Sequence, residues 1–144
     1  MGQRVTRQGP GTRTEEAVTR PVLLDASFLI ELERETASGV EGPARQFLPR
    51  LRGRVLVVSV VTIEEILEGA ADEMQALAAL NRFSMHGVQL AQARRCAMLQ
   101  RRSPRRLGEN DAWLVATAQS IDADVLGADR NAFERLGTNY LRFR

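Results

Sequence analysis

The sequence predicts an α/β fold, a three-layer α/β/α sandwich in which helices cover both faces of a mainly parallel β-sheet. The most informative segment, residues 55–61, is a continuous run of β-branched and leucine residues with a single serine, which is typical of a strand buried on both faces. A shorter apolar run occurs at residues 22–24, and residues 123–126 are apolar except for Asp124. Helix-like segments separate these three strand candidates. Strands that alternate with helices pair in parallel through right-handed crossovers, which gives this architecture.

The chain begins with a segment that differs in composition from the rest. Residues 1–20 are rich in Gly, Thr, Gln and Arg, and we expect them to form a flexible tail because they bury too little apolar surface to become ordered. Residues 21–144 are predicted to form a single domain. Its first strand, residues 22–24, ends at Asp25, and Ser27 is the expected N-cap of the first helix.

Glycine and proline delimit the elements that follow. The first helix is expected to end at Gly39, and Pro43 suits the first turn of a second helix that ends at Gly53. After the strand at 55–61, Thr62 is the predicted start of a helix that stops at Gly69. The remaining predicted elements are a helix over 74–83, a strand over 88–90, a helix over 91–102, a helix capped by Asn110, a strand over 123–126, a helix over 130–136 and a strand over 140–143.

Composition excludes several kinds of site. The 144 residues include one cysteine, so an intramolecular disulfide and a multi-cysteine zinc site are both excluded, and we expect the protein to be cytoplasmic. All 20 basic residues are arginine, and the absence of lysine excludes P-loop nucleotide hydrolysis and Schiff-base chemistry. No apolar run approaches the roughly 20 residues of a membrane span, so we expect no membrane association.

Four acidic residues are expected at the edge of the sheet where the strands have their carboxyl ends. In parallel sheets this edge binds ligands. Converging carboxylates repel one another unless a cation or protons neutralise them, and a ligand set made only of oxygens selects Mg²⁺ or Mn²⁺. A carboxylate cage of this kind activates water for attack on a phosphodiester. The four residues are Asp25, Glu65, Asp111 and Asp129.

Each of these acids also has an ordinary structural interpretation. Asp25 is a residue type that is common at turns. Glu65 can complete a capping box that begins at Thr62, and the local sequence taken alone favours this capping role for Glu65. Asp111 suits the positive end of a helix dipole, and Asp129 suits a loop. None of these interpretations explains why four chain segments each bring an acid to the same edge.

Four segments resemble the motifs of PIN-domain ribonucleases, and within that family the chain is similar to the VapC-type toxins of bacterial toxin–antitoxin pairs. The resemblance extends from about residue 21 to residue 144, and its third motif is the most specific. The four segments are residues 23–30 (LLDASFLI), 59–69 (SVVTIEEILEG), 108–118 (GENDAWLVATA) and 125–133 (VLGADRNAF).

The resemblance implies a PIN-like fold and an endoribonuclease that depends on Mg²⁺ or Mn²⁺. It implies that Asp25 and Asp111 are the most direct metal ligands and that Glu65, rather than Glu64, completes the acidic centre together with Asp129. It further implies a cognate antitoxin protein and a homodimer, for which the apolar residues near 74–80 offer a surface. Three polar residues are expected to contact the acids without binding the metal directly: Ser27, Thr62 and Asn110.

Two positions depart from the family pattern. Ala26 and Ser27 stand where the family usually has Thr and Asn, and Gly127 stands where a Thr or Ser usually precedes the fourth acid by two residues. These departures leave open an alternative function, a PIN-like module that binds RNA or a protein without cutting. A hydrolase of small phosphate esters is a further alternative.

An acid-free, arginine-rich segment lies before Asp111, over residues 81–108. Guanidinium groups match phosphate geometry, so the arginines near Pro104 are expected to contact the RNA backbone, although Arg94 and Arg95 equally suit a solvated helix face. The arginines expected to bind RNA are Arg101, Arg102, Arg105 and Arg106. We expect His86 to be a surface residue in a loop and Trp113 to belong to the core.

Overall fold

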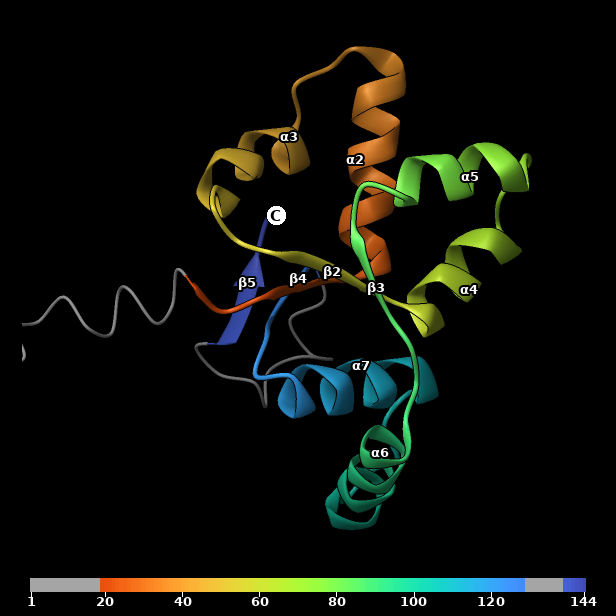
Figure 1. The fold of residues 1–144 in the computed structure, drawn as a ribbon, viewed down its shortest axis with the longest axis vertical. Coiled ribbons are helices and arrows are strands. Elements are labelled where there is room, and N and C mark those ends of the chain that lie inside the picture. The colour runs from red at the N-terminus through yellow and green to blue at the C-terminus, as the bar shows by residue number, and fades with distance from the viewer. Residues whose placement is uncertain (1–18, 129–138) are drawn as a thin grey trace, which may run out of the picture.

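The computed structural model describes residues 19–128 and 139–144, and in them five parallel strands form one sheet in the order β3-β2-β1-β4-β5 (Figure 1). The strands are β1 (Val22–Leu24), β2 (Leu56–Ser59), β3 (Ser84–His86), β4 (Asp124–Gly127) and β5 (Tyr140–Arg142). The helices are α2 (Ala26–Ser38), α3 (Pro43–Phe47), α4 (Val60–Glu68), α5 (Glu73–Leu80), α6 (Leu90–Arg102) and α7 (Glu109–Ser120), with a 3₁₀ turn, η1 (Leu48–Leu51), after α3.

Helices cover both faces of this sheet, which confirms the predicted three-layer α/β/α fold. Helices α2, α3, α4 and α5 lie on one side, and α6 and α7 lie on the other (Figure 1). Along β1 the side chains alternate: Val22 and Leu24 pack with Phe28 of α2, whereas Leu23 packs with Leu114 of α7. Each face of the sheet therefore has its own apolar core, as a strand buried on both faces requires.

The strand predicted over 55–61 is shorter in the structure because a helix begins inside it. Ser59 is the N-cap of α4, with extended backbone angles, and its hydroxyl accepts a hydrogen bond from the Val61 amide at 3.2 Å. The predicted helix start at Thr62 is therefore wrong. The pairing of β2 with β3 ends at Ser59, so Val60 and Val61 have no ladder partner there and join the helix instead.

Two other helices also begin before their predicted caps. Asp25, rather than Ser27, is the N-cap of α2, and its carboxylate accepts from the Ser27 amide. Gly108, rather than Asn110, is the N-cap of α7, and no side chain caps this helix. Ser27 and Asn110, which were expected to cap these two helices, lie instead in their first turns.

The third strand lies earlier in the chain than expected. It is formed by β3, residues Ser84–His86, and the predicted strand over 88–90 is wrong. Val88 is exposed, and Gln89 is the N-cap of α6, in a reciprocal capping box with Gln92. His86 therefore belongs to an edge strand, where its ring nitrogen Nε2 lies 2.8 Å from the Gln92 side-chain nitrogen. Of the flexible tail predicted over 1–20, residues 1–18 lie outside the described residues, as does the predicted helix over 130–136. Arg20, at the end of this predicted tail, forms ion pairs with Asp122 and Asp124.

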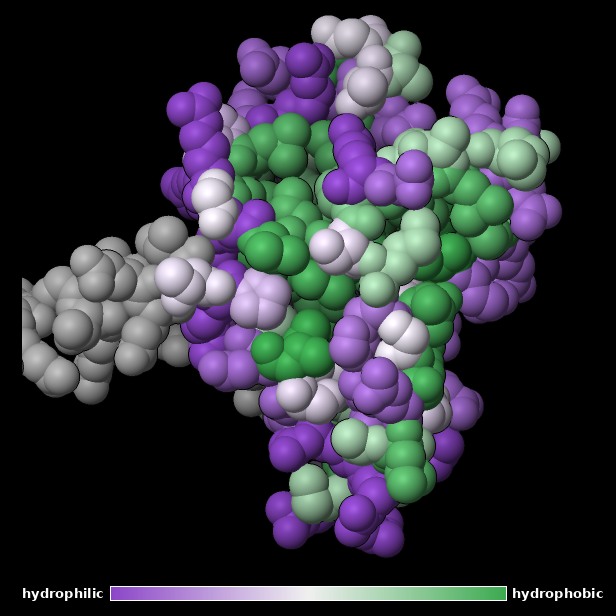
Figure 2. All heavy atoms as spheres, viewed as in Figure 1, coloured by the Kyte–Doolittle hydropathy of each residue, from purple (hydrophilic) through white to green (hydrophobic). Residues whose placement is uncertain are grey.

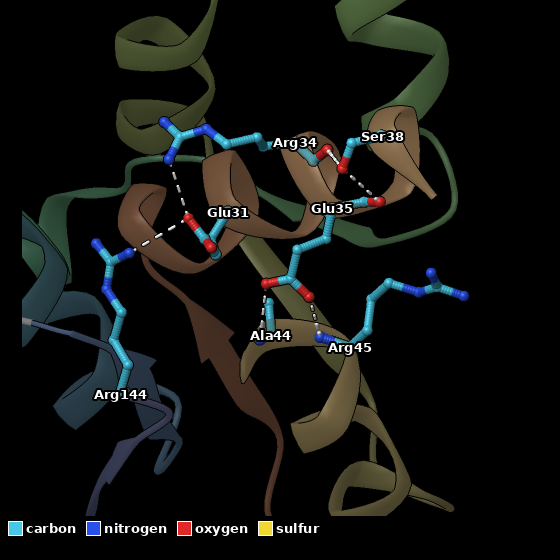
Figure 3. Close-up of polar contacts among 7 residues, drawn as sticks. All are labelled: Glu31, Arg34, Glu35, Ser38, Ala44, Arg45 and Arg144. Atoms are coloured by element: carbon cyan, nitrogen blue, oxygen red, sulfur yellow. Dashed lines mark hydrogen bonds and ion pairs between the residues drawn. The ribbon is translucent and has the colours of Figure 1, made fainter. Parts of the chain in front are cut away.

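A buried carboxylate joins two helices on the α2 side of the sheet (Figure 3). Glu35 is 3% exposed, and its two oxygens accept from the backbone amides of Ala44 and Arg45 at 3.0 and 2.9 Å. Burial acts to raise the pKa of Glu35, but hydrogen bonds from these amides and from that of Gly42 lower it overall. A side chain of α2 thus satisfies the unpaired amides at the start of α3. Gly42 is required here because a Cβ would lie 2.7 Å from the Glu35 side chain.

An ion-pair network lies at the opposite edge of the sheet, where the strands have their amino ends. Asp124, at the start of β4, pairs with Arg54 and with Arg20, and Arg54 also donates to the Arg20 carbonyl oxygen at 3.1 Å. The network joins three chain segments that are distant in sequence. The network lies away from the edge where the strands have their carboxyl ends.

Candidate active site

Three of the four predicted acids lie at the carboxyl edge of the sheet. Asp25 directly follows β1, Glu65 lies on α4 after β2, and Asp111 lies in the first turn of α7. The pKa of Glu65 is raised, first by burial and then by the negative charges of Asp25 and Asp111. Glu65 is therefore close enough to both Asp25 and Asp111 to be repelled by their charges. Asp129 lies outside the described residues.

The start of α4 decides between two interpretations of Glu65. Because Ser59 is the N-cap, Thr62 is the third residue of the helix and Glu65 is the sixth. A capping box requires an acid at the third position, so the capping interpretation is wrong. Glu65 is half-buried and electrostatically coupled to the other two acids, whereas its neighbour Glu64 is exposed.

The chemistry of this centre fits a divalent cation, although its present geometry is open. All three side chains offer oxygen, the donor that Mg²⁺ and Mn²⁺ prefer, and the charges of Asp25 and Asp111 add to the effect of burial in raising the pKa of Glu65. Within residues 19–128 and 139–144, no three acidic, histidine or cysteine side chains form a group that could hold one ion. The metal-ligand roles of the acids therefore remain predictions.

A serine holds the carboxylate of Asp25. The Ser27 hydroxyl donates to Asp25 Oδ2 at 2.6 Å and accepts from the Ala128 amide, which follows β4, at 3.1 Å. Ser27 thus contacts the acidic centre directly, in addition to lying in the first turn of α2. The Ala128 amide is a part of the site that the sequence did not indicate, because a backbone group has no residue-type signal.

The other two residues that were predicted to support the acids, Asn110 and Thr62, differ in their surroundings. The Asn110 side-chain amide donates a hydrogen bond to Glu65, which acts to lower the pKa of that carboxyl. Thr62 is 1% exposed within α4. Gly108 packs closely against Asp111, since a Cβ at that position would lie 3.1 Å from Asp111 Oδ2. Because Gly108 has no Cβ, the Asp111 carboxylate can lie against the backbone at the start of α7.

The predicted RNA-binding arginines are exposed at the end of α6 and in the loop before α7. Gln100 fixes this loop to α6, because its side chain donates to the Leu107 carbonyl at 3.1 Å and accepts from the Leu107 amide at 2.9 Å. No ion pair between described residues involves the four arginines, which leaves their charges available to a polyanion. They are Arg101, Arg102, Arg105 and Arg106.

A shallow groove of about 380 Å³ borders the acidic centre between α4 and α7. Val60, Val61 and Trp113 form its apolar part, and Glu64, Glu109 and Asn110 complete the lining. Trp113 is half-buried and packs against Cys96 and two alanines, so the expectation that it belongs to the core is correct only in part.

A second groove, of about 440 Å³, lies between α2, α4 and α5. Residues near 74–80, which the sequence offered as a dimer surface, line one of its sides. Hydrophobic surface gathers over α4 and α5 and continues along β3 toward α6 (Figure 2). The apolar residues of the groove include Leu29, Ile30, Ile66, Leu80 and Phe83, and its charged residues are Glu33, Arg34, Asp72 and Arg82.

The fold and the carboxyl-edge acids together define a class of protein: a small parallel α/β domain with an acidic centre. The PIN domain family profile matches residues 22–139, so the chain belongs to the PIN domain family. No curated protein matches the chain at a significant level. None of the helices in the described part of the chain is long and apolar enough to cross a membrane.

Solved structures with the same fold come from toxin–antitoxin systems. The chain is similar to a toxin–antitoxin complex from Klebsiella pneumoniae, with a TM-score of 0.70 and 23% identity over 85% of this chain and 98% of that one. It is also similar to DNA-bound VapBC from Salmonella typhimurium (TM-score 0.65, 19% identity, 88% and 100% coverage). A third is Mycobacterium tuberculosis VapC20, described as a Sarcin-Ricin loop cleaving toxin (TM-score 0.60, 19% identity, 81% and 95% coverage).

Proposed function

We propose that this PIN domain is a Mg²⁺- or Mn²⁺-dependent endoribonuclease and the toxin of a cytoplasmic toxin–antitoxin pair. The observation that supports this most directly is the electrostatic coupling of Glu65 to Asp25 and Asp111 at the carboxyl edge of the sheet. Membership of the PIN domain family and the similarity to a structure described as a Sarcin-Ricin loop cleaving toxin support RNA as the substrate class.

The chain's own residues have distinct tasks in this proposal. Asp25, Glu65 and Asp111, with Asp129, would hold the cation. A bound cation would supply positive charge to the cleaved phosphodiester and make a water molecule more acidic. The exposed arginines before α7 bind neighbouring phosphates and orient the strand, since a guanidinium pairs with two phosphate oxygens at once.

Substitution of single acids tests the activity. Asp25→Asn and Asp111→Asn should each reduce Mn²⁺-dependent cleavage of RNA by more than about a hundredfold, because even outer-shell partners of a metal are worth 10- to 100-fold. Circular dichroism should show that both variants remain folded. Glu64→Gln is the matched control, because Glu64 is an exposed neighbour of the centre, and it should cleave like the unmodified protein. Full activity in both aspartate variants would contradict the proposal.

A second function, binding of RNA without cleavage, is supported by Ala26 and Gly127, which offer no polar side chain at positions where the family usually has one. The two functions differ in metal uptake. Titration calorimetry with Mn²⁺ should detect binding that depends on Asp25 and Asp111 if the domain is a nuclease. RNA binding without any such uptake would favour the non-cleaving module.

We infer that the antitoxin covers the groove between α2, α4 and α5, whose apolar floor and charged rim suit an amphipathic segment. This proposal gives the residues near 74–80, which the sequence indicated as a dimer surface, to the antitoxin instead. The second subunit of a homodimer would then use the edge with β3 and the start of α6, where Met85 and Leu90 are exposed. Ala79 lines the groove, whereas Ala78 is exposed and does not. Ala79→Arg should therefore abolish co-purification with the antitoxin encoded beside the toxin, and Ala78→Arg should not. Equal co-purification of both variants would place the antitoxin elsewhere.

A further inference from the structure

Ser27 occupies a junction between two chain segments that lie about a hundred residues apart. Its hydroxyl donates to Asp25 Oδ2 at 2.6 Å and accepts from the Ala128 amide at 3.1 Å. The directions of both bonds are fixed, because a backbone amide can only donate and an ionised carboxylate can only accept. The Ser27 proton therefore points at Asp25, and donation from Ala128 strengthens the bond that this proton makes.

The hydroxyl, more than the helix backbone, sets the orientation of the Asp25 carboxylate. An N-cap aspartate usually turns toward the amides of the first turn. In this protein the Ser27 amide lies 3.4 Å from Oδ2, a longer distance than that of the hydroxyl. The same oxygen receives both groups, which leaves Oδ1 without a bond to either of them. Loss of the hydroxyl would let the carboxylate rotate toward the helix.

Strand β4 fixes the other side of this junction. The Asp25 amide donates to the Leu126 carbonyl at 2.9 Å, and the Ala128 amide reaches Asp25 through Ser27. Gly127, between these two residues, has no side chain that could contact the acid. Among the described residues, Ser27 is therefore the side chain that links the Ala128 amide, directly after β4, to the Asp25 carboxylate.

We propose that Ser27 is a positioning residue that couples the Asp25 carboxylate to the backbone after β4 and so presets one carboxylate oxygen for a divalent cation. The inference rests on the proposed function, because it concerns the orientation of Asp25, a side chain that is predicted to bind the metal. On this proposal, Ser27 supplies the hydroxyl beside Asp25 that a glycine at position 127 cannot offer.

Substitution of the serine, with Mn²⁺ affinity as the readout, tests the proposal. Ser27→Ala should weaken Mn²⁺ binding about tenfold in calorimetry, the effect usual for an outer-shell partner, and Ser27→Thr should restore it by returning a hydroxyl. Ser38→Ala is the matched control, since Ser38 lies on the same helix and its hydroxyl contacts only backbone carbonyls. Amide hydrogen exchange should show faster exchange at Ala128 in Ser27→Ala only.

The outcomes separate this inference from the proposed function. If the unmodified protein binds no Mn²⁺, the proposed function fails, and the inference fails with it. If it binds Mn²⁺ and Ser27→Ala binds equally tightly, only the inference is overturned, even when Ala128 exchanges faster, because the serine is then purely structural. Failure of Ser27→Thr to restore affinity would also overturn it. Thermal unfolding should confirm that each variant is folded before its Mn²⁺ affinity is compared with that of the unmodified protein.

Discussion

At the scale of single residues, Glu65 shows how the surroundings of a carboxylate affect stability. Burial and the charges of Asp25 and Asp111 raise its pKa above the ordinary value of 4.5. Between that value and the folded-state pKa, the folded protein holds a proton that the unfolded chain has lost. The free energy of unfolding therefore falls as pH rises through this window, and at neutral pH the Glu65 charge destabilises the metal-free fold.

Glu65→Gln should consequently stabilise the metal-free protein at neutral pH. Removal of a partly exposed repulsive charge is worth up to about 1 kcal/mol, or an increase in Tm of about 1–4 °C for a domain of this size. Thermal unfolding at pH 7 and pH 4 checks this, because the difference should shrink at the lower pH. Glu64→Gln provides the comparison, and an equal increase in Tm for that variant would show that the repulsion among Glu65, Asp25 and Asp111 is not the cause.

At the scale of elements, the ion-pair network of Asp124 fastens the start of β4 to the segments that precede β1 and β2. Asp124 is 5% exposed, and its partner Arg54 is also largely buried. Removal of one member of a buried pair leaves the other charge uncompensated, which typically costs about 3–5 kcal/mol. Such a network stabilises the edge of the sheet that is opposite the acidic centre.

Asp124→Ala should therefore lower the free energy of unfolding by about 3 kcal/mol, as measured by urea denaturation. Asp122→Asn is the control, because Asp122 is exposed and its ion pair with Arg20 should contribute less than about 1 kcal/mol. Asn also tolerates the positive φ of 53° at this position better than Ala does. The proposed activity lies at the other edge, so any Asp124→Ala protein that remains folded should still bind Mn²⁺. Equal losses of stability in the two variants would contradict the role assigned to burial.

The helix ends that a glycine or a proline determines, as at Gly39 and Pro43, could be predicted from the sequence. Gly39 ends α2 in the left-handed conformation (φ 70°) that glycine tolerates best, and Pro43 opens α3, as expected. Ends that depend on strand pairing could not be predicted. The run 55–61 has strand propensity throughout, but its last two valines join α4 because the neighbouring strand stops.

At the scale of the whole molecule, parallel topology made the acidic centre predictable. Once β1 and β2 were recognised as parallel strands, their carboxyl ends had to lie at a common edge, and the structure brings Asp25 and Glu65 near Asp111 there. The link from Ser27 to Ala128 was not predictable in the same way. It joins residues 101 positions apart through a backbone amide, and only the folded chain brings the two together.

Because three separate elements supply the acids, a bound cation should stabilise the whole domain. Binding to the folded state alone adds about 2.7 kcal/mol at a Mn²⁺ concentration one hundred times the Kd, which corresponds to an increase in Tm of about 5–10 °C. The increase should diminish below the raised pKa of Glu65, where protons compete with the ion, and EDTA should reverse it. Asp111→Asn should show almost no increase, whereas Glu64→Gln should show all of it. An equal increase in the Asp111→Asn protein would mean that Mn²⁺ binds elsewhere, and the carboxyl edge would then lose its assigned role.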